Sequence, residues 1–252
     1  MPATLSGAIL EPMLRDDPVG PRITYYDDGV RADGERIELS AATLANWAAK
    51  TGNLLRDELG AGPGSRVAVL LPAHWQTAAV LFGVWWIGAE VVLEGAADPH
   101  TDMALCTIER LDEADSAVSA AASGGEVAVL SLDPFGRPAP DLPIGVTDYA
   151  TAVRVHGDQI VPERHPGPAL AGRSVGEILA DCERSSAARG LTSADRVLSS
   201  ASWTGPDELV DNLLAVLAVG ASLVQVAAPA GTQADPAARQ RRIETEKITR
   251  VL

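Results

Sequence analysis

The feature that most constrains the fold is an internal repeat. Residues 60–67 and 190–197 both run from a glycine through a short turn to an Arg-Val pair, and residues 88–92 and 220–224 both begin with Gly-Ala and end in two aliphatic residues. The paired segments are offset by 130 and 132 residues. An alternative is that any two strand-helix-strand units look alike, but the shared order of these features favours a duplicated unit.

Each copy of the repeat predicts a strand, a helix and a second strand. Residues 66–72 form an apolar run rich in β-branched residues, which is typical of a strand buried on both faces of a parallel sheet. A helix over 74–87 ends at Gly88, and residues 91–93 predict the next strand. In the second copy Pro206 begins the helix. We therefore predict an α/β protein with two related, parallel-rich α/β subdomains.

An irregular, proline-containing stretch at 161–172 is predicted to link the two units. Residues 1–160 then form the first subdomain with an N-terminal extension, and residues 173–252 form the second, repeat-related subdomain. Nothing periodic develops before residue 36, apart from an extended candidate at 22–26. The other predicted elements are an amphipathic helix at 41–59, a moderately helical stretch at 102–121, a strand at 126–132, a helix at 175–189, a polar helix that Asp235-Pro236 begins, and a strand at 248–252.

Composition excludes several classes of protein. The net charge of −14 leaves no basic footprint for nucleic acid or an anionic membrane surface. The longest apolar run, residues 78–89, is shorter than the roughly 20 residues that cross a bilayer. Two cysteines are too few for a disulfide scaffold, and the first residues lack a secretory pattern, so we expect a cytoplasmic protein. The abundance of alanine and arginine over lysine is typical of a high-GC bacterial source.

The ordered motifs resemble a known family. Gly-Pro-Gly-Ser-Arg-Val at 62–67, Leu-Leu-Pro at 70–72 and Gly-Ala-x-Val-Val at 88–92 resemble the N-terminal region of AMP-forming acyl-adenylate synthetases, the superfamily of acyl-CoA synthetases, adenylation domains and luciferases. Residues 195–224 resemble the next subdomain of that family, and residues 243–252 the helix and strand after it. The resemblance spans about Thr24 to Leu252, and it implies a large domain built from two related α/β subdomains.

The family that the sequence resembles carries motifs for ATP binding and adenylation that have no counterpart in this sequence. Family members carry a Ser/Thr/Gly-rich loop ending in Pro-Lys-Gly, whose backbone N–H groups and lysine bind the ATP phosphates. The matching interval here, 166–175, has two prolines, and no lysine lies between Lys50 and Lys247. Arg173 and Ser174 are candidate phosphate contacts, but a surface turn into the next helix is the simpler interpretation. The family's Tyr-Gly-x-Thr-Glu segment, ribose aspartate and C-terminal lysine have no counterpart, so we expect no adenylation by this chain alone.

Candidate ligand contacts follow the two repeated strands, because ligands of doubly wound sheets bind outside the carboxyl ends of strands. Each of the segments 72–76 and 200–204 carries a tryptophan beside polar side chains, a combination suited to holding a flat or acyl group. The candidates are His74, Trp75, Ser202, Trp203 and Thr204. The alternative is that the tryptophans belong to the core and the polar side chains cap helices.

Other kinds of site find little support in the sequence. The four histidines lie far apart without metal-ligand spacing, and the cysteines form no Cys-x-x-Cys motif. Cys182 falls on the apolar stripe of its helix, so we expect it to belong to the core. We therefore predict no metal site and no cofactor. The serine-rich segment at 199–202 is not a Gly-x-Ser-x-Gly elbow.

These observations predict a catalytically incomplete acyl-CoA synthetase-like protein that acts as a ligand-binding or regulatory module. Its ligand would be an acyl, nucleotide or CoA-like molecule. Two alternatives remain open: the chain is half of a split ligase that a partner chain completes, or it is a structural homodimer that pairs through the strand at 248–252.

Overall fold

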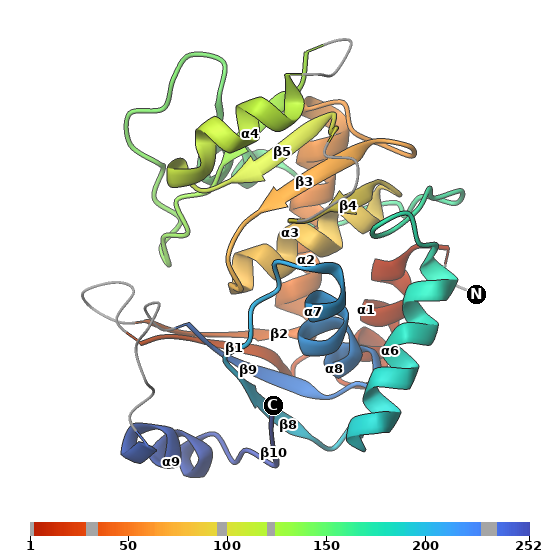
Figure 1. The fold of residues 1–252 in the computed structure, drawn as a ribbon, viewed down its shortest axis with the longest axis vertical. Coiled ribbons are helices and arrows are strands. Elements are labelled where there is room, and N and C mark those ends of the chain that lie inside the picture. Colours follow the sequence, from red (N-terminus) through yellow and green to blue (C-terminus); the bar gives the residue numbers. More distant parts are fainter. Residues whose placement is uncertain (1–2, 29–34, 95–99, 120–123, 228–235) are drawn as a thin grey trace.

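The computed structural model describes residues 3–28, 35–94, 100–119, 124–227 and 236–252. Its strands form two five-stranded sheets, one above the other in Figure 1. The central-chain sheet has the order β4-β3-β5-β6-β7, and the terminal sheet has the order β10-β8-β9-β1-β2. All strand pairs are parallel except β1 with β2, so the predicted α/β class with two parallel-rich sheets is confirmed.

The strands of the central-chain sheet are β3 (Arg66–Leu70), β4 (Glu90–Val92), β5 (Met103–Cys106), β6 (Glu126–Val129) and β7 (Thr147–Asp148). The strands of the terminal sheet are β1 (Pro21–Asp27), β2 (Glu35–Ser40), β8 (Arg196–Ser199), β9 (Ser222–Ala227) and β10 (Arg250–Val251). The main helices are α1 (Leu5–Asp16), α2 (Ala41–Asn53), α3 (Trp75–Trp86), α4 (Leu111–Val118), α5 (Tyr149–Ala152), α6 (Val175–Arg189), α7 (Pro206–Leu209), α8 (Ala215–Ala218) and α9 (Pro236–Thr245). The π-helical segments are η1 (Leu54–Glu58) and η4 (Val210–Leu214), and the 3₁₀ segments are η2 (Ile108–Arg110) and η3 (Val153–Val155).

The two copies of the repeat fold alike. Arg66 of β3 pairs with Glu90 of β4, and Arg196 of β8 pairs with Ser222 of β9, so the strand-helix-strand units share the register that the sequence offset predicts. Gly88 and Gly220, which precede the second strand of each unit, both have left-handed backbones, with φ of 74° and 81°. This conformation favours glycine, which explains why the glycine recurs in both copies.

Helices α2 and α3 lie between the two sheets (Figure 1), where α3 contacts β3 and β4 on one side and β1 on the other. Every residue of α3 is buried, which agrees with the predicted buried helix. A helix that is apolar on all sides suits this position, because a sheet or helix covers each of its faces.

The N-terminal strands do not join the subdomain in which the sequence analysis placed them. Strand β1 pairs with β9 in parallel, from Ile23 with Leu223 to Asp27 with Ala227, and β2 forms the adjacent edge. Strands β1 and β2 are therefore part of the terminal sheet, which also contains β8, β9 and β10. The segment 161–172 also contacts the central-chain sheet, since Val91 donates to the Ala169 carbonyl at 3.0 Å.

Two element predictions were wrong. Residues 5–16 form α1, although no helical pattern is evident there, because Gly7 and Pro12 interrupt it; Thr4 caps the helix by accepting from the Gly7 N–H at 3.1 Å. The predicted helical stretch at 102–121 begins instead with strand β5, buried between β3 and β6. Asp235, the predicted start of the last helix, lies outside the described residues, and α9 itself runs over 236–245.

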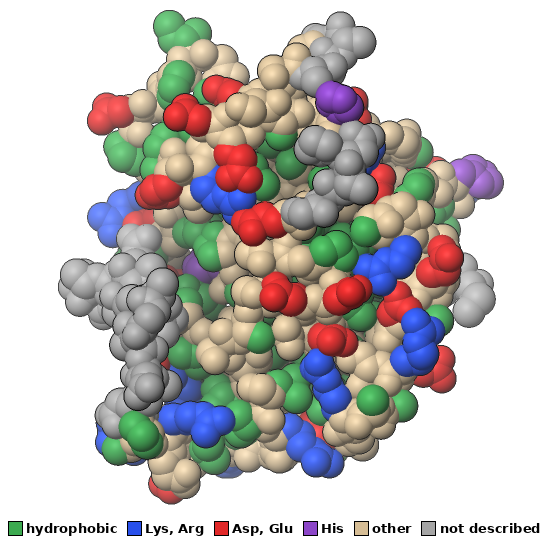
Figure 2. Space-filling model, viewed as in Figure 1, with side chains coloured by type: hydrophobic (Ala, Val, Ile, Leu, Met, Phe, Trp, Pro, Cys, Tyr) green, Lys and Arg blue, Asp and Glu red, His purple; other side chains and the backbone are tan. Residues whose placement is uncertain are grey.

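Charged side chains are mixed over the face shown in Figure 2, with Lys and Arg most frequent along its lower edge, over α9 and β10. Within the part of the chain that the structure describes, no helix is both long enough and apolar enough to span a bilayer.

Candidate functional site

His74 lies at the carboxyl end of β3, where it is buried and begins α3. Its Nδ1 accepts from the Gln76 N–H at 3.1 Å, so in the neutral ring the proton is on Nε2. The ring centroids of His74 and Tyr25 of β1 lie 4.3 Å apart, nearly edge-on. This histidine thus connects the end of the central-chain sheet to the terminal sheet.

Trp75 follows His74 and is also buried. Its indole N–H donates to Glu35 Oε1 at 3.3 Å, and its ring meets Trp47 of α2 at 5.7 Å between centroids. The structure therefore brings His74 and Trp75 together, within a layer of aromatic rings between the sheets.

The second candidate segment follows β8 and surrounds the carboxylate of Glu208 in α7. Glu208 Oε2 accepts from Ser202 Oγ at 2.7 Å, from Thr204 Oγ1 at 3.1 Å and from the Gly205 N–H at 3.2 Å. The bonds from Ser202 and Gly205 lower the pKa of the Glu208 carboxyl. Ser202 is exposed and Thr204 half-buried, whereas Trp203 is only 2% exposed.

The hydroxyls of Ser202 and Thr204 are thus brought together on one carboxylate, while Trp203 belongs to the core. A bond of 3.1 Å from the Glu94 N–H to the Thr204 carbonyl ties this segment to the chain just after β4. The candidate residues form two groups at the carboxyl ends of the repeated strands, and their role as ligand contacts stays a prediction.

A tight turn occupies the interval in which the resemblance places the phosphate loop. Leu170 and Arg173 bond to each other across the turn, and Ala171 and Gly172 between them have φ of 50° and 73°. The Gly172 N–H donates to Glu90 Oε1 at 2.6 Å, and the Ala169 N–H to the Arg173 carbonyl at 2.7 Å. The N–H groups of Ala169, Gly172 and Arg173 are therefore bonded inside the protein.

A capping box forms the N-terminus of α6, the helix that follows this turn. The Ser174 hydroxyl accepts from the Glu177 N–H, while the Glu177 carboxylate accepts from Ser174 N at 2.9 Å and from Ser174 Oγ at 2.7 Å. These bonds lower the pKa of Glu177. The positive end of α6 thus already holds a carboxylate of the same chain.

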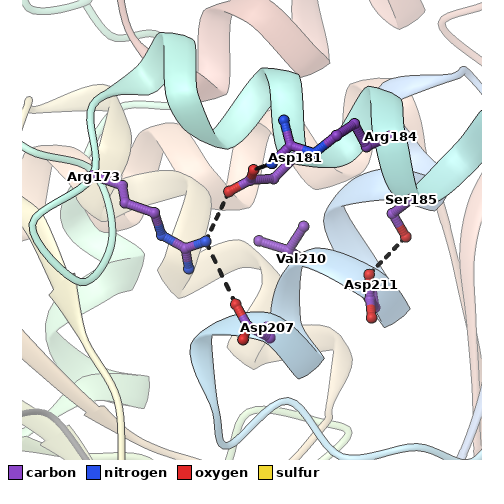
Figure 3. Close-up of a pocket in the computed structure, with 7 residues that line it drawn as sticks. All are labelled: Arg173, Asp181, Arg184, Ser185, Asp207, Val210 and Asp211. Carbon is purple, nitrogen blue, oxygen red and sulfur yellow. Dashed lines mark hydrogen bonds and ion pairs between the residues drawn. The ribbon is translucent and has the colours of Figure 1, made fainter.

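A groove of about 490 Å³ lies beside the turn, between α6 and the helical run of α7 and η4 (Figure 3). Arg173 reaches across it, with its guanidinium 2.7 Å from Asp181 and 3.5 Å from Asp207. The groove is lined by Arg173, Asp181, Arg184, Ser185, Asp207, Val210 and Asp211.

Sequence reasoning did not find this groove. The four-residue spacings of Asp181 with Ser185 and of Asp207 with Asp211 predict one polar face on each helix. That the two faces meet depends on how α6 packs against η4 and α8, which no local pattern shows. The hydrogen bond of 2.6 Å from Ser185 to Asp211 joins them.

Both cysteines are buried, and burial raises the pKa of each thiol to about 12. The prediction that Cys182 belongs to the core is confirmed. Among the residues described, no three His, Cys, Asp or Glu side chains converge as ligands for a metal ion.

The chain is 76% identical over 251 residues to the TIGR03089 family protein of Mycobacterium tuberculosis (strain ATCC 25618 / H37Rv), covering 100% of this chain and 99% of that protein. The chain belongs to the TIGR03089 family. No protein-family model matches it.

Solved structures similar to this TIGR03089 family chain are acyl-CoA and aryl-CoA ligases, which confirms the predicted resemblance at the level of the fold. The acyl-CoA synthetase of Brucella canis matches 98% of the chain with a TM-score of 0.76 and 19% identity. The anthranilate CoA ligase AuaEII, solved in complex with anthranoyl-AMP, matches 100% of it with a TM-score of 0.74 and 17% identity. The benzoate CoA ligase of Burkholderia xenovorans LB400 matches 98% with a TM-score of 0.70 and 16% identity.

The TIGR03089 family chain spans about half the length of these solved ligases, covering 46%, 50% and 49% of their chains.

Proposed function

We propose that this protein is a ligand-binding or regulatory module with an acyl-CoA synthetase fold that does not adenylate carboxylates by itself. The observation that carries the proposal is the closed turn at 170–173. In the family that the sequence resembles, the corresponding loop must present free N–H groups and a lysine to a triphosphate.

The turn offers neither of these groups. The N–H groups of Gly172 and Arg173 have protein acceptors, and the nearest cation, the Arg173 guanidinium, is engaged by Asp181 and Asp207. A phosphate bound here would have to break these interactions. The bond from Gly172 to Glu90 and the pairing of Arg173 with Asp181 are charge-assisted and therefore among the stronger hydrogen bonds of a protein.

Local charge also opposes a triphosphate. Glu90 bonds the turn itself, and the Glu177 carboxylate occupies the N-terminus of α6, where a phosphate would otherwise bind. Catalysis of adenylyl transfer depends on positioning the reactants and on stabilising the negative charge of the transition state. A site lined with carboxylates does not stabilise that charge, so it would not accelerate the reaction.

The ligand that this fold supports best is an acyl, nucleotide or CoA-like molecule. One solved structure of the same fold holds anthranoyl-AMP. The carboxyl ends of β3 and β8, with His74, Trp75, Ser202, Trp203 and Thr204, are the positions at which such a ligand would contact this chain.

A thermal-shift screen with MgATP, AMP, CoA, acyl-CoAs and a non-hydrolysable acyl-adenylate mimic tests the proposal. A ligand at ~100 times its dissociation constant adds about 2.7 kcal/mol to the stability of the native state, which is easily measured. We expect stabilisation by an acyl, AMP or CoA compound and none by MgATP. Stabilisation by MgATP alone would contradict the proposal, and no response to any compound would shift the role to a protein partner.

A second candidate function rests on the fold that the chain shares with the solved ligases. A partner chain that supplies the phosphate loop and the lysine would make a split ligase. Its signature would be a stable hetero-complex, captured with tagged protein, that exchanges pyrophosphate into ATP when neither chain does so alone.

A further inference from the structure

Helix α9 covers the face of the terminal sheet that is turned away from α2 and α3 (Figure 1). On that face Leu198, Val224 and Val226 form a small apolar cluster that is separate from the main core. Ile243 and Ile248 pack on this cluster but are themselves only half-buried, and no residue of α9 is buried. The cover therefore removes little apolar surface from water, and burial alone holds it weakly.

A carboxylate of the same segment lies at the centre of this contact. Glu246, just after α9, is buried, and its Oε1 accepts from Arg36 Nε at 3.0 Å and from the Tyr26 hydroxyl. Its Oε2 accepts from the Arg196 guanidinium. Strands β1, β2 and β8 thus supply donors to both carboxylate oxygens, and we call Tyr26, Arg36 and Arg196 the carboxylate pocket.

The carboxylate pocket requires an anion. Glu38 pairs with Arg36 at 2.9 Å and with Arg196 at 3.4 Å, so one carboxylate of the sheet already faces the two guanidinium groups. Glu246 supplies the second negative charge that balances them. The Arg196 side chain is only 15% exposed, and a guanidinium withdrawn from water in this way is costly without a partner.

The closed position of the cover also carries a local strain. Lys247, beside Glu246, has a left-handed backbone with φ of 52°, a conformation that favours glycine. Outside the carboxylate pocket, Arg242 of α9 pairs with both oxygens of Asp28 and lies 4.2 Å from the centre of the Tyr26 ring. Asp28 is exposed, and ion pairs open to water contribute little to stability. The cover is therefore poised to open.

We propose that this face of the terminal sheet is a docking surface, covered here by α9 and residues 246–248, for a protein segment that carries a carboxylate between aliphatic side chains. The segment that the surface already holds defines this chemistry. The partner carboxylate takes the place of Glu246 on Arg36 and Arg196, and its aliphatic side chains take the places of Ile243 and Ile248. The inference goes beyond the proposed function, because it does not involve the turn at 170–173 or the candidate ligand contacts.

The probe is a fluorescein-labelled peptide with the sequence of residues 243–249, titrated with the full chain and followed by fluorescence anisotropy. The matched peptide carries Glu246→Gln and should bind about tenfold more weakly, because it cannot pair with the arginines. Non-specific attraction to a chain of net charge −14 would favour the glutamine peptide, which is the less negative of the two. Weaker binding of that peptide therefore identifies the carboxylate pocket.

Two variants of the full chain test whether the peptide displaces α9. Arg242→Ala removes the pair with Asp28 and should bind the peptide about tenfold more tightly than the wild type, because the open state is more populated. Arg239→Ala, at an exposed position of the same helix, is the control and should bind as the wild type does. Bound peptide should also lower the protection of the α9 amides against hydrogen exchange.

If Arg242→Ala does not fold, Asp28→Asn removes the same pair from the sheet side and replaces it in the titration. Equal binding of the two peptides overturns the inference, as does binding that leaves the protection of α9 unchanged. Absence of binding to the wild type and to the variant with the weakened cover overturns it as well.

Discussion

At the scale of single residues, α2 and α3 pack closely at Gly83. A Cβ atom added there would lie 2.7 Å from Thr51 Cβ and 3.0 Å from the Ala48 carbonyl oxygen. Both neighbours belong to α2, whose backbone is fixed between the two sheets. The hydrogen atom of glycine is therefore what allows the two helices to approach each other this closely.

Gly83→Ala should lower the free energy of unfolding by about 1–3 kcal/mol, because overpacking outweighs the better helix propensity of alanine. Gly176→Ala in α6 is the matched control: nothing lies within 4 Å of an added Cβ there, and the residue is exposed. That variant should gain up to about 1 kcal/mol. Denaturant unfolding measures both, and changes of the same sign would contradict the packing argument.

The candidate site could be predicted only in part from the sequence. Strand ends located the segments that contain His74 and Trp203, but the direction of each side chain depends on packing that no local pattern encodes. The contacts observed agree with the alternative interpretation, in which the polar side chains cap helices and the tryptophans belong to the core. His74 caps α3, and Trp203 is in the core.

At the scale of elements, helix α9 is held to the terminal sheet mainly by charge. None of its residues is buried. Glu246, just after the helix, bonds Arg36 at 3.0 Å and also bonds Tyr26 and Arg196. Arg242 of α9 pairs with both carboxylate oxygens of Asp28. This helix should therefore open more readily than α3 or α6.

Burial alone would raise the pKa of Glu246, but bonds from Arg36, Tyr26 and Arg196 lower it to about 2. An acid with a depressed pKa stabilises the folded state above its ordinary pKa of 4.5, and this contribution is lost as the pH falls from 4.5 through 2.

Glu246→Gln should lower the protection of α9 amides against hydrogen exchange at pH 7, relative to their intrinsic exchange rates. It should also remove the loss of protection that we expect in the wild-type helix as the pH falls through that acid window. Glu244→Gln, at an exposed position of the same helix, is the control and should change little. Unchanged exchange in Glu246→Gln would show that apolar contacts of Ile243 and Ile248 hold the helix instead.

The periodic helices α2 and α6 were predicted well, and α3 was predicted from its unbroken apolar run. Strand β5 was not, because Met, Ala and Leu favour helices, and only its position between β3 and β6 makes it a strand. Helix α1 was missed for the opposite reason, since Gly7 and Pro12 weaken a helix that burial of Leu5, Ile9 and Leu10 stabilises.

At the scale of the whole molecule, the repeat predicted the two strand-helix-strand units but not the composition of the terminal sheet. Ile23 of β1 pairs with Leu223 of β9, 200 residues away. Pairing between strands so far apart in the chain produces no periodic pattern in the sequence. The two sheets with α2 and α3 between them are the framework that places the turn at 170–173 beside Glu90 and Asp181.

We propose that this framework lacks a working phosphate loop, and ATP–pyrophosphate exchange tests that proposal most directly. The purified chain would be assayed with a panel of aliphatic and aromatic carboxylic acids, beside the benzoate CoA ligase of Burkholderia xenovorans LB400 with benzoate as a positive control. We predict no exchange above the protein-free blank for any acid. Exchange that rises with protein concentration, co-elutes with the chain and is lost in Arg173→Ala would contradict the account, because it would show that the turn binds ATP.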